Sequence, residues 1–137
     1  MKVAIIGGGI VGATCAYYLS KDNDIELTVF DYGVGQATKA SAGIISPWFS
    51  KRRNKPWYKM ARLGADFYLK LVQDLEDEGI NTNFYSQCGV YLLKKDEVKL
   101  PELKELAESR MELSPMIGEL KLLSKEDVQK VIPSFDN

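Results

Sequence analysis

The stretch from Lys2 to Asp31 constrains the fold of this chain more than any other part of the sequence. It contains a short apolar run, the glycine-rich segment GGGIVG at residues 7–12, a run of small and apolar residues, and a second apolar run that stops at Asp31. This order predicts a strand, a tight turn, a helix, a second strand and a carboxylate. The distance from Gly12 to Asp31 matches the separation of roughly 20 residues found in βαβ units that bind a dinucleotide.

Each glycine of this pattern has its own physical role. Gly7 lets the chain turn tightly out of the first strand, Gly9 lets a pyrophosphate approach the backbone, and Gly12 lets the helix pack close to the sheet. The helix N-terminus then directs unpaired N–H groups and a partial positive charge at the phosphates, and the acid accepts hydrogen bonds from ribose hydroxyls. The predicted site residues in this stretch are Gly7, Gly8, Gly9, Ile10, Val11, Gly12, Asp31 and Tyr32.

Two alternatives to a nucleotide site stay open at this point. Glycine turns are common, so residues 7–12 also suit a strand-to-helix turn that binds no ligand. Acids often mark strand ends, so Asp31 on its own suits ordinary turn chemistry. The strand before the glycines, the helix after them and the acid beyond favour the nucleotide site.

Composition excludes several other kinds of function. A net charge of −1 over 137 residues gives no field for nucleic acid, and no apolar run approaches the roughly 20 residues of a membrane helix. The first strand begins at the N-terminus, which leaves no room for a signal peptide, so we expect a cytoplasmic protein. The sequence has no histidine, and its two cysteines, Cys15 and Cys88, are far apart, so we predict no metal site and no Ser-His catalysis.

The rest of the chain predicts further helices and a few short strands. Helices are expected over 10–20, 56–78 and 101–113, with a last short helix capped by Ser124 and ended by Pro133. Pro56 suits the first turn of the long helix, and Gly79 suits its C-terminal stop. Residues 32–43 are expected to form a loop, and strands are expected at 83–86, 89–94 and 120–123.

These elements predict an α/β fold. Residues 1–55 would form a Rossmann-like βαβ unit with a small-residue loop, and residues 56–137 a long helix and the start of a mixed-sheet α+β domain. Two parallel strands alone cannot cover a large cofactor or build a substrate pocket. We therefore expect the chain to be an incomplete part of a longer enzyme.

Three segments carry a resemblance to a known family. They are VAIIGGGIVGATCAYYL with its following acid, the small-residue loop ATKASAGII at residues 37–45, and the pair formed by CGVYLL at 88–93 and LSKEDV at 123–128 before a proline. With these the chain resembles the D-amino-acid oxidase and glycine oxidase family of FAD-dependent amine oxidoreductases, which also includes D-amino-acid dehydrogenases. The likeness to the N-terminal part of those longer proteins covers nearly the whole chain.

The resemblance implies a flavin site. Gly7, Gly9 and Gly12 would hold the FAD pyrophosphate and Asp31 the adenosine ribose. A second group of residues would contact the pyrophosphate, the near edge of the flavin and its isoalloxazine ring: Thr38, Ser41, Ala42, Gly43 and Ile44. Glutamate is the commoner acid at the ribose, and the shorter aspartate leaves NAD as an open alternative. Residues 37–43 also suit a flexible surface loop.

The resemblance also implies an activity: oxidation of an amino acid or secondary amine by hydride transfer from the substrate Cα–H to flavin N5, followed by imine hydrolysis. The expected partner is a small-molecule amino acid or amine. Peripheral contact with the inner membrane and a homo-oligomer of the full-length protein stay open, and no catalytic residue is assigned within the chain. The alternatives are an NAD-dependent Rossmann dehydrogenase and a non-catalytic nucleotide-binding module.

A basic segment competes with this interpretation. Lys51, Arg52, Arg53 and Lys55 lie between aromatic residues, a pattern that also occurs where proteins bind single-stranded nucleic acid or a membrane surface. One short cluster in a nearly neutral chain is a weak footprint. We favour a solvated loop flanked by buried rings, with an arginine that meets a substrate carboxylate as a further alternative.

Overall fold

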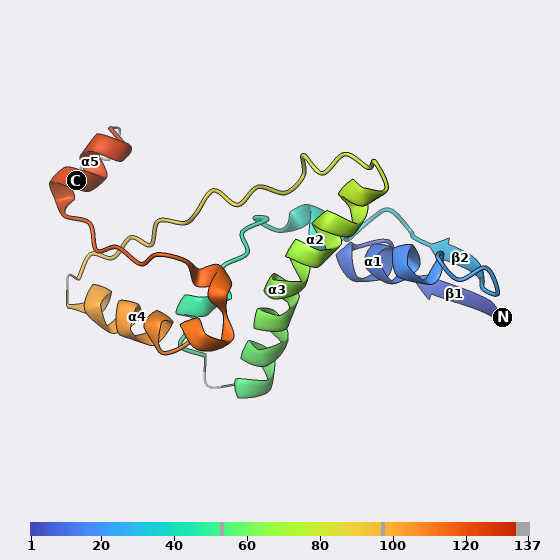
Figure 1. Ribbon diagram of the computed structural model, residues 1–137, viewed down its shortest axis with the longest axis horizontal. Helices are drawn as coiled ribbons and strands as arrows, with labels where there is room; N and C mark the ends of the chain where they lie inside the picture. Colours follow the sequence, from blue (N-terminus) through green and yellow to red (C-terminus); the bar gives the residue numbers. More distant parts are fainter. Residues whose placement is uncertain (53, 97, 134–137) are drawn as a thin grey trace. The chain divides into compact units, whose positions relative to one another are not determined.

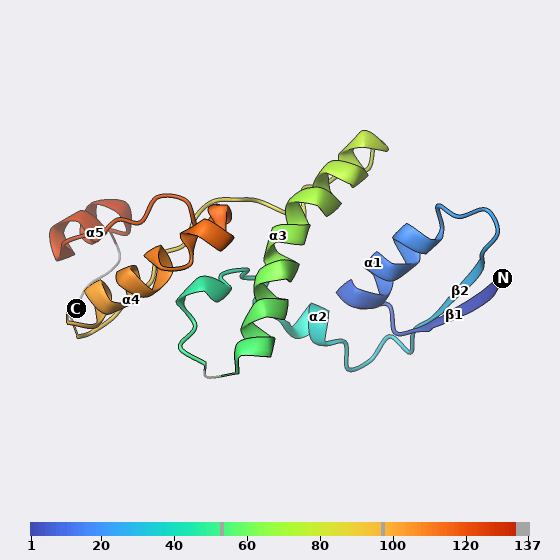
Figure 2. The ribbon, with the colours of Figure 1, turned by 60° about the horizontal axis from the view of Figure 1, so that its bottom comes forward.

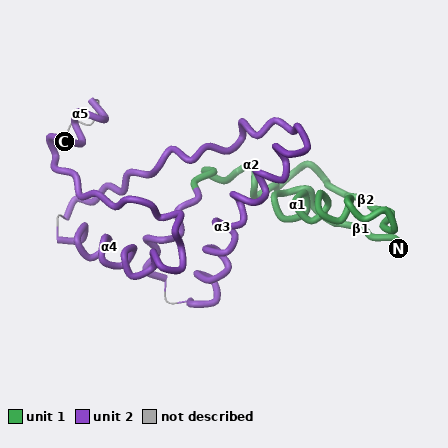
Figure 3. The backbone as a smooth tube through the Cα atoms, viewed as in Figure 1, with its two compact units in different colours: residues 1–44 green, residues 45–137 purple. Residues whose placement is uncertain are grey.

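The computed structural model describes residues 1–52, 54–96 and 98–133. The chain divides into two compact units, residues 1–44 and residues 45–137, which Figure 3 shows in different colours. Each unit is described by itself below. The domain boundary that the sequence places after residue 55 stays a prediction.

The first unit is a βαβ element followed by one short helix. Strand β1 (Lys2–Ile6) and strand β2 (Glu26–Phe30) pair in parallel, with Lys2 opposite Glu26 and Ile6 opposite Phe30. Helix α1 (Ile10–Leu19) connects them and lies alongside both strands (Figures 1 and 2). The α/β class and the βαβ unit predicted from the sequence are confirmed.

The second unit is helical in its regular parts. Its elements, in chain order, are η1 (Pro47–Phe49), α3 (Lys55–Asp77), α4 (Lys99–Glu108), η2 (Met111–Leu113), η3 (Pro115–Ile117) and α5 (Lys125–Val131). Helix α3 begins where the Asn54 side chain accepts a hydrogen bond from the Trp57 N–H at 3.0 Å. It ends at Gly79, whose φ of 74° and backbone bonds to the last turn form a Schellman cap.

The buried core of the described residues belongs to this second unit. Helices α3 and α4 both contact η1, and the buried apolar side chains are Trp48, Ala65, Leu71, Leu103 and Ala107. The Arg110 guanidinium contacts three residues beside this core. It donates to the carbonyl oxygens of Trp48 and Ser50 and lies 4.0 Å from the centre of the Tyr58 ring.

Several local predictions are wrong. No strand forms at 83–86, 89–94 or 120–123 within the described residues, and residues 80–96 run largely without regular structure after α3 (yellow in Figure 1). A strand needs a partner for its backbone groups, and no such partner lies among the described residues. Helix α4 spans 99–108, where a helix to residue 113 was expected, because the chain then tightens into two 3₁₀ turns.

Within the described ranges, no helix is long and apolar enough to cross a membrane. The same ranges hold no cluster of three or more His, Cys, Asp or Glu residues that would suit a metal ion.

Candidate dinucleotide-binding site

The turn between β1 and α1 has the backbone geometry that the glycine pattern predicts. Gly7 has a φ of 97°, a conformation that favours glycine, and its N–H donates to the Phe30 carbonyl at 2.7 Å. A Cβ atom at Gly12 would lie 1.9 Å from the Gly7 carbonyl oxygen and 3.2 Å from Cγ2 of Ile5. Position 12 therefore requires glycine, because any side chain there would push α1 away from the strand.

The N-terminus of α1 carries N–H groups without acceptors. The Ala13 N–H makes the first intrahelical bond, to the Gly9 carbonyl at 2.8 Å, and the Ile10 N–H donates to the Thr38 hydroxyl at 3.0 Å. The N–H groups of Val11 and Gly12 donate to nothing among the described residues. Such a helix end is a ready site for an anion, because the exposed N–H groups and the helix dipole both favour negative charge.

Asp31 closes the other side of the glycine turn. Its Oδ2 accepts the Gly8 N–H at 2.5 Å, and its Oδ1 accepts the Gly33 N–H at 2.7 Å and the side-chain amide of Gln36. These bonds, with that of Gly8 largest and the charge of Lys39 a smaller effect, lower the pKa of the Asp31 carboxyl. The acid is therefore a fixed, ionised acceptor at the end of β2.

The small-residue loop reaches the turn at one point. Thr38 lies on α2 (Ala37–Ala40), a short helix where a loop was expected, and a Cβ atom at Gly9 would lie 3.0 Å from its hydroxyl oxygen. Ser41 donates to the Thr38 carbonyl at 2.9 Å. The structure thus brings Thr38 to the glycine segment.

Three other predicted residues have exposed side chains: the exposed fraction is 92% for Tyr32, 76% for Val11 and 73% for Ile44. Ala42 and Gly43 are also exposed, and Gly43 has a φ of 69°. Their roles toward a flavin stay predictions.

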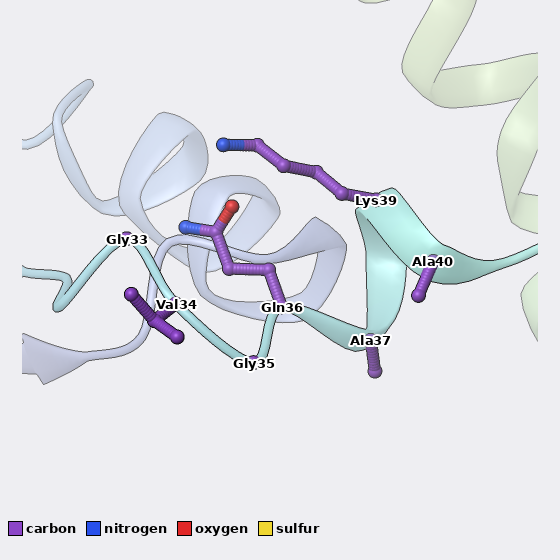
Figure 4. Close-up of a pocket in the computed structure, with 7 residues that line it drawn as sticks. All are labelled: Gly33, Val34, Gly35, Gln36, Ala37, Lys39 and Ala40. Atoms are coloured by element: carbon purple, nitrogen blue, oxygen red, sulfur yellow. The ribbon is translucent and has the colours of Figure 1, made fainter.

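Sequence reasoning missed Gln36 and Lys39. Both line an open hollow of about 580 Å³ formed by residues 33–37, 39 and 40 (Figure 4). Gly33 and Gly35 have φ values of 79° and 72°, and the two turns fold Gln36 back onto Asp31. The sequence did hold a signal for this turn. Gly33 and Gly35 follow the acid closely, and glycines in such positions indicate that the chain reverses direction.

The basic segment is partly engaged within the second unit. Lys51 pairs with Glu102 at 2.7 Å, and the Arg52 guanidinium lies 4.7 Å from the centre of the Trp57 ring. Arg53, which belongs to the same segment, lies outside the described residues. These contacts favour the interpretation of a solvated loop beside aromatic rings.

The geometry of the first unit fits a dinucleotide. Three features define a dinucleotide-binding α/β protein. They are a glycine turn with no room for a Cβ atom at Gly12, unpaired N–H groups at the start of a helix, and an ionised acid at the end of the next strand. The chain belongs to the FAD dependent oxidoreductase family (DAO), whose model matches residues 2–137. That family is FAD dependent, so the cofactor is FAD, and the NAD alternative is set aside.

Similar proteins agree with this family. The chain is 41% identical over 130 residues to the uncharacterized oxidoreductase YurR of Bacillus subtilis (strain 168). The aligned residues make up 94% of this chain and 35% of that protein. The chain is 45% identical over 60 residues to a D-amino acid dehydrogenase of Methylobacterium sp. (strain 4-46), over 42% of this chain and 13% of that protein.

A solved structure shares the fold. The crystal structure of iminodiacetate oxidase from Chelativorans sp. BNC1 matches with a TM-score of 0.87 and 28% identity, over 97% of this chain and 36% of that chain. This chain therefore spans about a third of the length of YurR and of the iminodiacetate oxidase.

Proposed function

We propose that this chain is the FAD-binding portion of an enzyme that oxidises an amino acid or a secondary amine at the carbon next to nitrogen. FAD, when bound, supplies the hydride acceptor for such a reaction. The observation that carries the cofactor half of the proposal is the glycine turn: Val11 and Gly12 have unpaired N–H groups, and the Gly8 N–H donates to the Asp31 carboxylate.

The chain's own residues would bind and orient. The N–H groups at the start of α1 would hold the pyrophosphate, and Thr38, whose hydroxyl lies at the Ile10 N–H, would stand at its edge. Asp31 would accept a hydrogen bond from the adenosine ribose. Ser41, Ala42, Gly43 and Ile44 are proposed to follow the cofactor toward its flavin end.

The substrate half of the proposal depends on the similar proteins. Their names specify a D-amino acid in one case and iminodiacetate in another, and both are amines. No described residue of this chain has the geometry of a catalytic acid or base at this site. The class of donor, CH–NH or CH–NH₂, is therefore inferred from these relatives alone.

The test uses the full-length protein purified with FAD. Under anaerobic conditions we expect the flavin absorbance to bleach on addition of a D-amino acid, glycine or a secondary amine such as iminodiacetate. Lactate and glucose serve as controls, because they present CH–OH donors. Bleaching by a CH–OH donor alone would contradict the donor class, and a protein that stays colourless with added FAD would contradict the cofactor assignment.

A thermal-shift titration separates the two nucleotides. A ligand that binds only the folded protein raises its melting temperature by mass action. We expect FAD to raise it and NAD at the same concentration to leave it unchanged.

A further inference from the structure

Lys39 is the one lysine of the first unit whose charge has no direct partner among the described residues. That unit contains three lysines and no arginine. Lys2 pairs with Glu26 at 3.1 Å, and Lys21 donates to the Tyr17 hydroxyl at 2.9 Å. Lys39 makes no hydrogen bond and no ion pair with any residue that the structure describes.

The Lys39 side chain extends to the side of its loop on which the acid of the dinucleotide site lies. Figure 4 shows Gln36 and Lys39 extending to one side, while Val34 and Ala37 point to the other. Gln36 reaches Asp31 on that side, where its Nε2 donates to Oδ1. The ammonium group of Lys39 is therefore directed to the same side as the carboxylate.

The charge of Lys39 acts on this acid. The hydrogen bond from Gly8 is the main cause of the lowered pKa of Asp31, and the positive charge of Lys39 is a smaller one. The residue before Lys39 contacts the glycine turn, because the Thr38 hydroxyl accepts the Ile10 N–H at 3.0 Å. Lys39 thus lies next to the residue that joins α2 to the start of α1.

The other charge at this site opposes the proposed ligand. The diphosphate of FAD carries two negative charges, and the ionised Asp31 accepts the Gly8 N–H within the same glycine turn. Like charges repel each other. The N–H groups of Val11 and Gly12 attract an anion only through partial charges. One lysine without an ion-pair partner supplies the full positive charge that cancels the charge of Asp31.

We propose that Lys39 sets the charge of the dinucleotide site: its ammonium group offsets the Asp31 carboxylate and so favours the binding of a dianionic diphosphate at the glycine turn. Lys39 acts through the electric field of the site and is a positioning residue that needs no hydrogen bond to the ligand. The inference rests on the proposed function, because it takes the ligand to be FAD.

The test measures FAD binding to the full-length apoprotein by fluorescence titration at two salt concentrations. The distance over which exposed charges interact falls from about 30 Å at about 0.01 M salt to about 3 Å at about 1 M. At the lower concentration we expect Lys39→Gln to weaken FAD binding by roughly fivefold, the upper range for exposed charges. At the higher concentration the variant and the wild type should bind FAD equally well.

Two further variants serve as controls. Lys39→Arg keeps the positive charge, so we expect wild-type affinity for FAD at both salt concentrations. Lys2→Gln removes the same charge from the opposite end of β1, where Lys2 pairs with Glu26. We expect Lys2→Gln to change FAD affinity by less than about twofold, because an exposed ion pair contributes little.

Three results would overturn the inference while the wild type binds FAD. The first is unchanged FAD affinity of Lys39→Gln at the lower salt concentration. The second is a loss of the same size at both concentrations, and the third is an equal loss in Lys39→Arg; each of these would indicate a structural role only. Failure of the wild type to bind FAD would instead contradict the proposed function.

Discussion

Different kinds of contact stabilise the two units of this chain, each within itself. In residues 1–44 no side chain is fully buried, and the site is shaped by hydrogen bonds of main-chain N–H groups, that of Gly7 to the Phe30 carbonyl and that of Gly8 to the Asp31 carboxylate. In residues 45–137 a small apolar core that includes Trp48 packs between helices. The contrast teaches that the first unit is sensitive to atoms added at its glycines, and the second to side chains removed from its core.

The largest expected effect comes from Gly12→Ala. The added Cβ would lie 1.9 Å from the Gly7 carbonyl oxygen, which cannot move without disturbing β1. We expect the full-length variant to lose bound FAD, as measured by flavin absorbance after purification, and to melt at a lower temperature. Overpacking costs about 1–3 kcal/mol and often more when backbone is involved.

Gly64→Ala in α3 is the matched control, because nothing lies within 4 Å of a Cβ atom at that position. Replacing glycine by alanine in a helix interior stabilises by about 1 kcal/mol, so we expect a higher melting temperature and unchanged FAD content. Equal effects of the two substitutions would break the comparison between the units.

Arg110→Ala probes the second unit in the opposite way, by removal. The guanidinium bonds to two carbonyl oxygens, of Trp48 and Ser50, and faces the Tyr58 ring. We expect a loss of about 3 kcal/mol in the free energy of unfolding, measured by denaturant titration, with FAD affinity retained. Lys104→Ala removes only an exposed pair with Glu108 and should cost less than about 1 kcal/mol. Loss of FAD in Arg110→Ala at a temperature where it is folded would show that the site depends on this core.

Asn54→Ala tests the start of α3. Its side chain accepts the Trp57 N–H, and loss of an N-cap typically costs about 1 kcal/mol. Hydrogen exchange in the first turn of α3 should accelerate, while exchange near Gly79 at the other end stays the same. Acceleration along the whole helix would mean that the cap determines more than its own turn.

The smallest effect concerns acidity. Hydrogen bonds from Gly8, Gly33 and Gln36 lower the pKa of Asp31 in the folded protein. A lowered folded pKa gives stability that is present above the unfolded value of about 3.9 and is lost as the pH falls through the folded value. The stability difference between wild type and Asp31→Asn should therefore shrink as the pH drops from 5 toward 3. A difference that stays constant over that range would contradict the ionised state assigned to Asp31.

Local signals account for what the sequence predicted correctly. The glycine turn at 7–12, the N-terminal position of Pro56 and the Gly79 stop each depend on the backbone preferences of one or two residues. The cap at Ser124 is also as expected, because its hydroxyl accepts the Asp127 N–H at 3.2 Å.

Long-range pairing accounts for the failures. The run at residues 89–94 has the apolar pattern of a strand, but Tyr91 is 53% exposed and no strand in the described part of the chain pairs with its backbone. Gln36 was missed because its contact with Asp31 depends on two positive φ values that a sequence pattern does not specify.

The most direct test is a crystal structure of the full-length protein with FAD bound. The account predicts diphosphate oxygens within hydrogen-bond distance of the Val11 and Gly12 N–H groups, with the adenosine ribose at Asp31. A flavin diphosphate bound elsewhere, with the glycine turn empty, would contradict it.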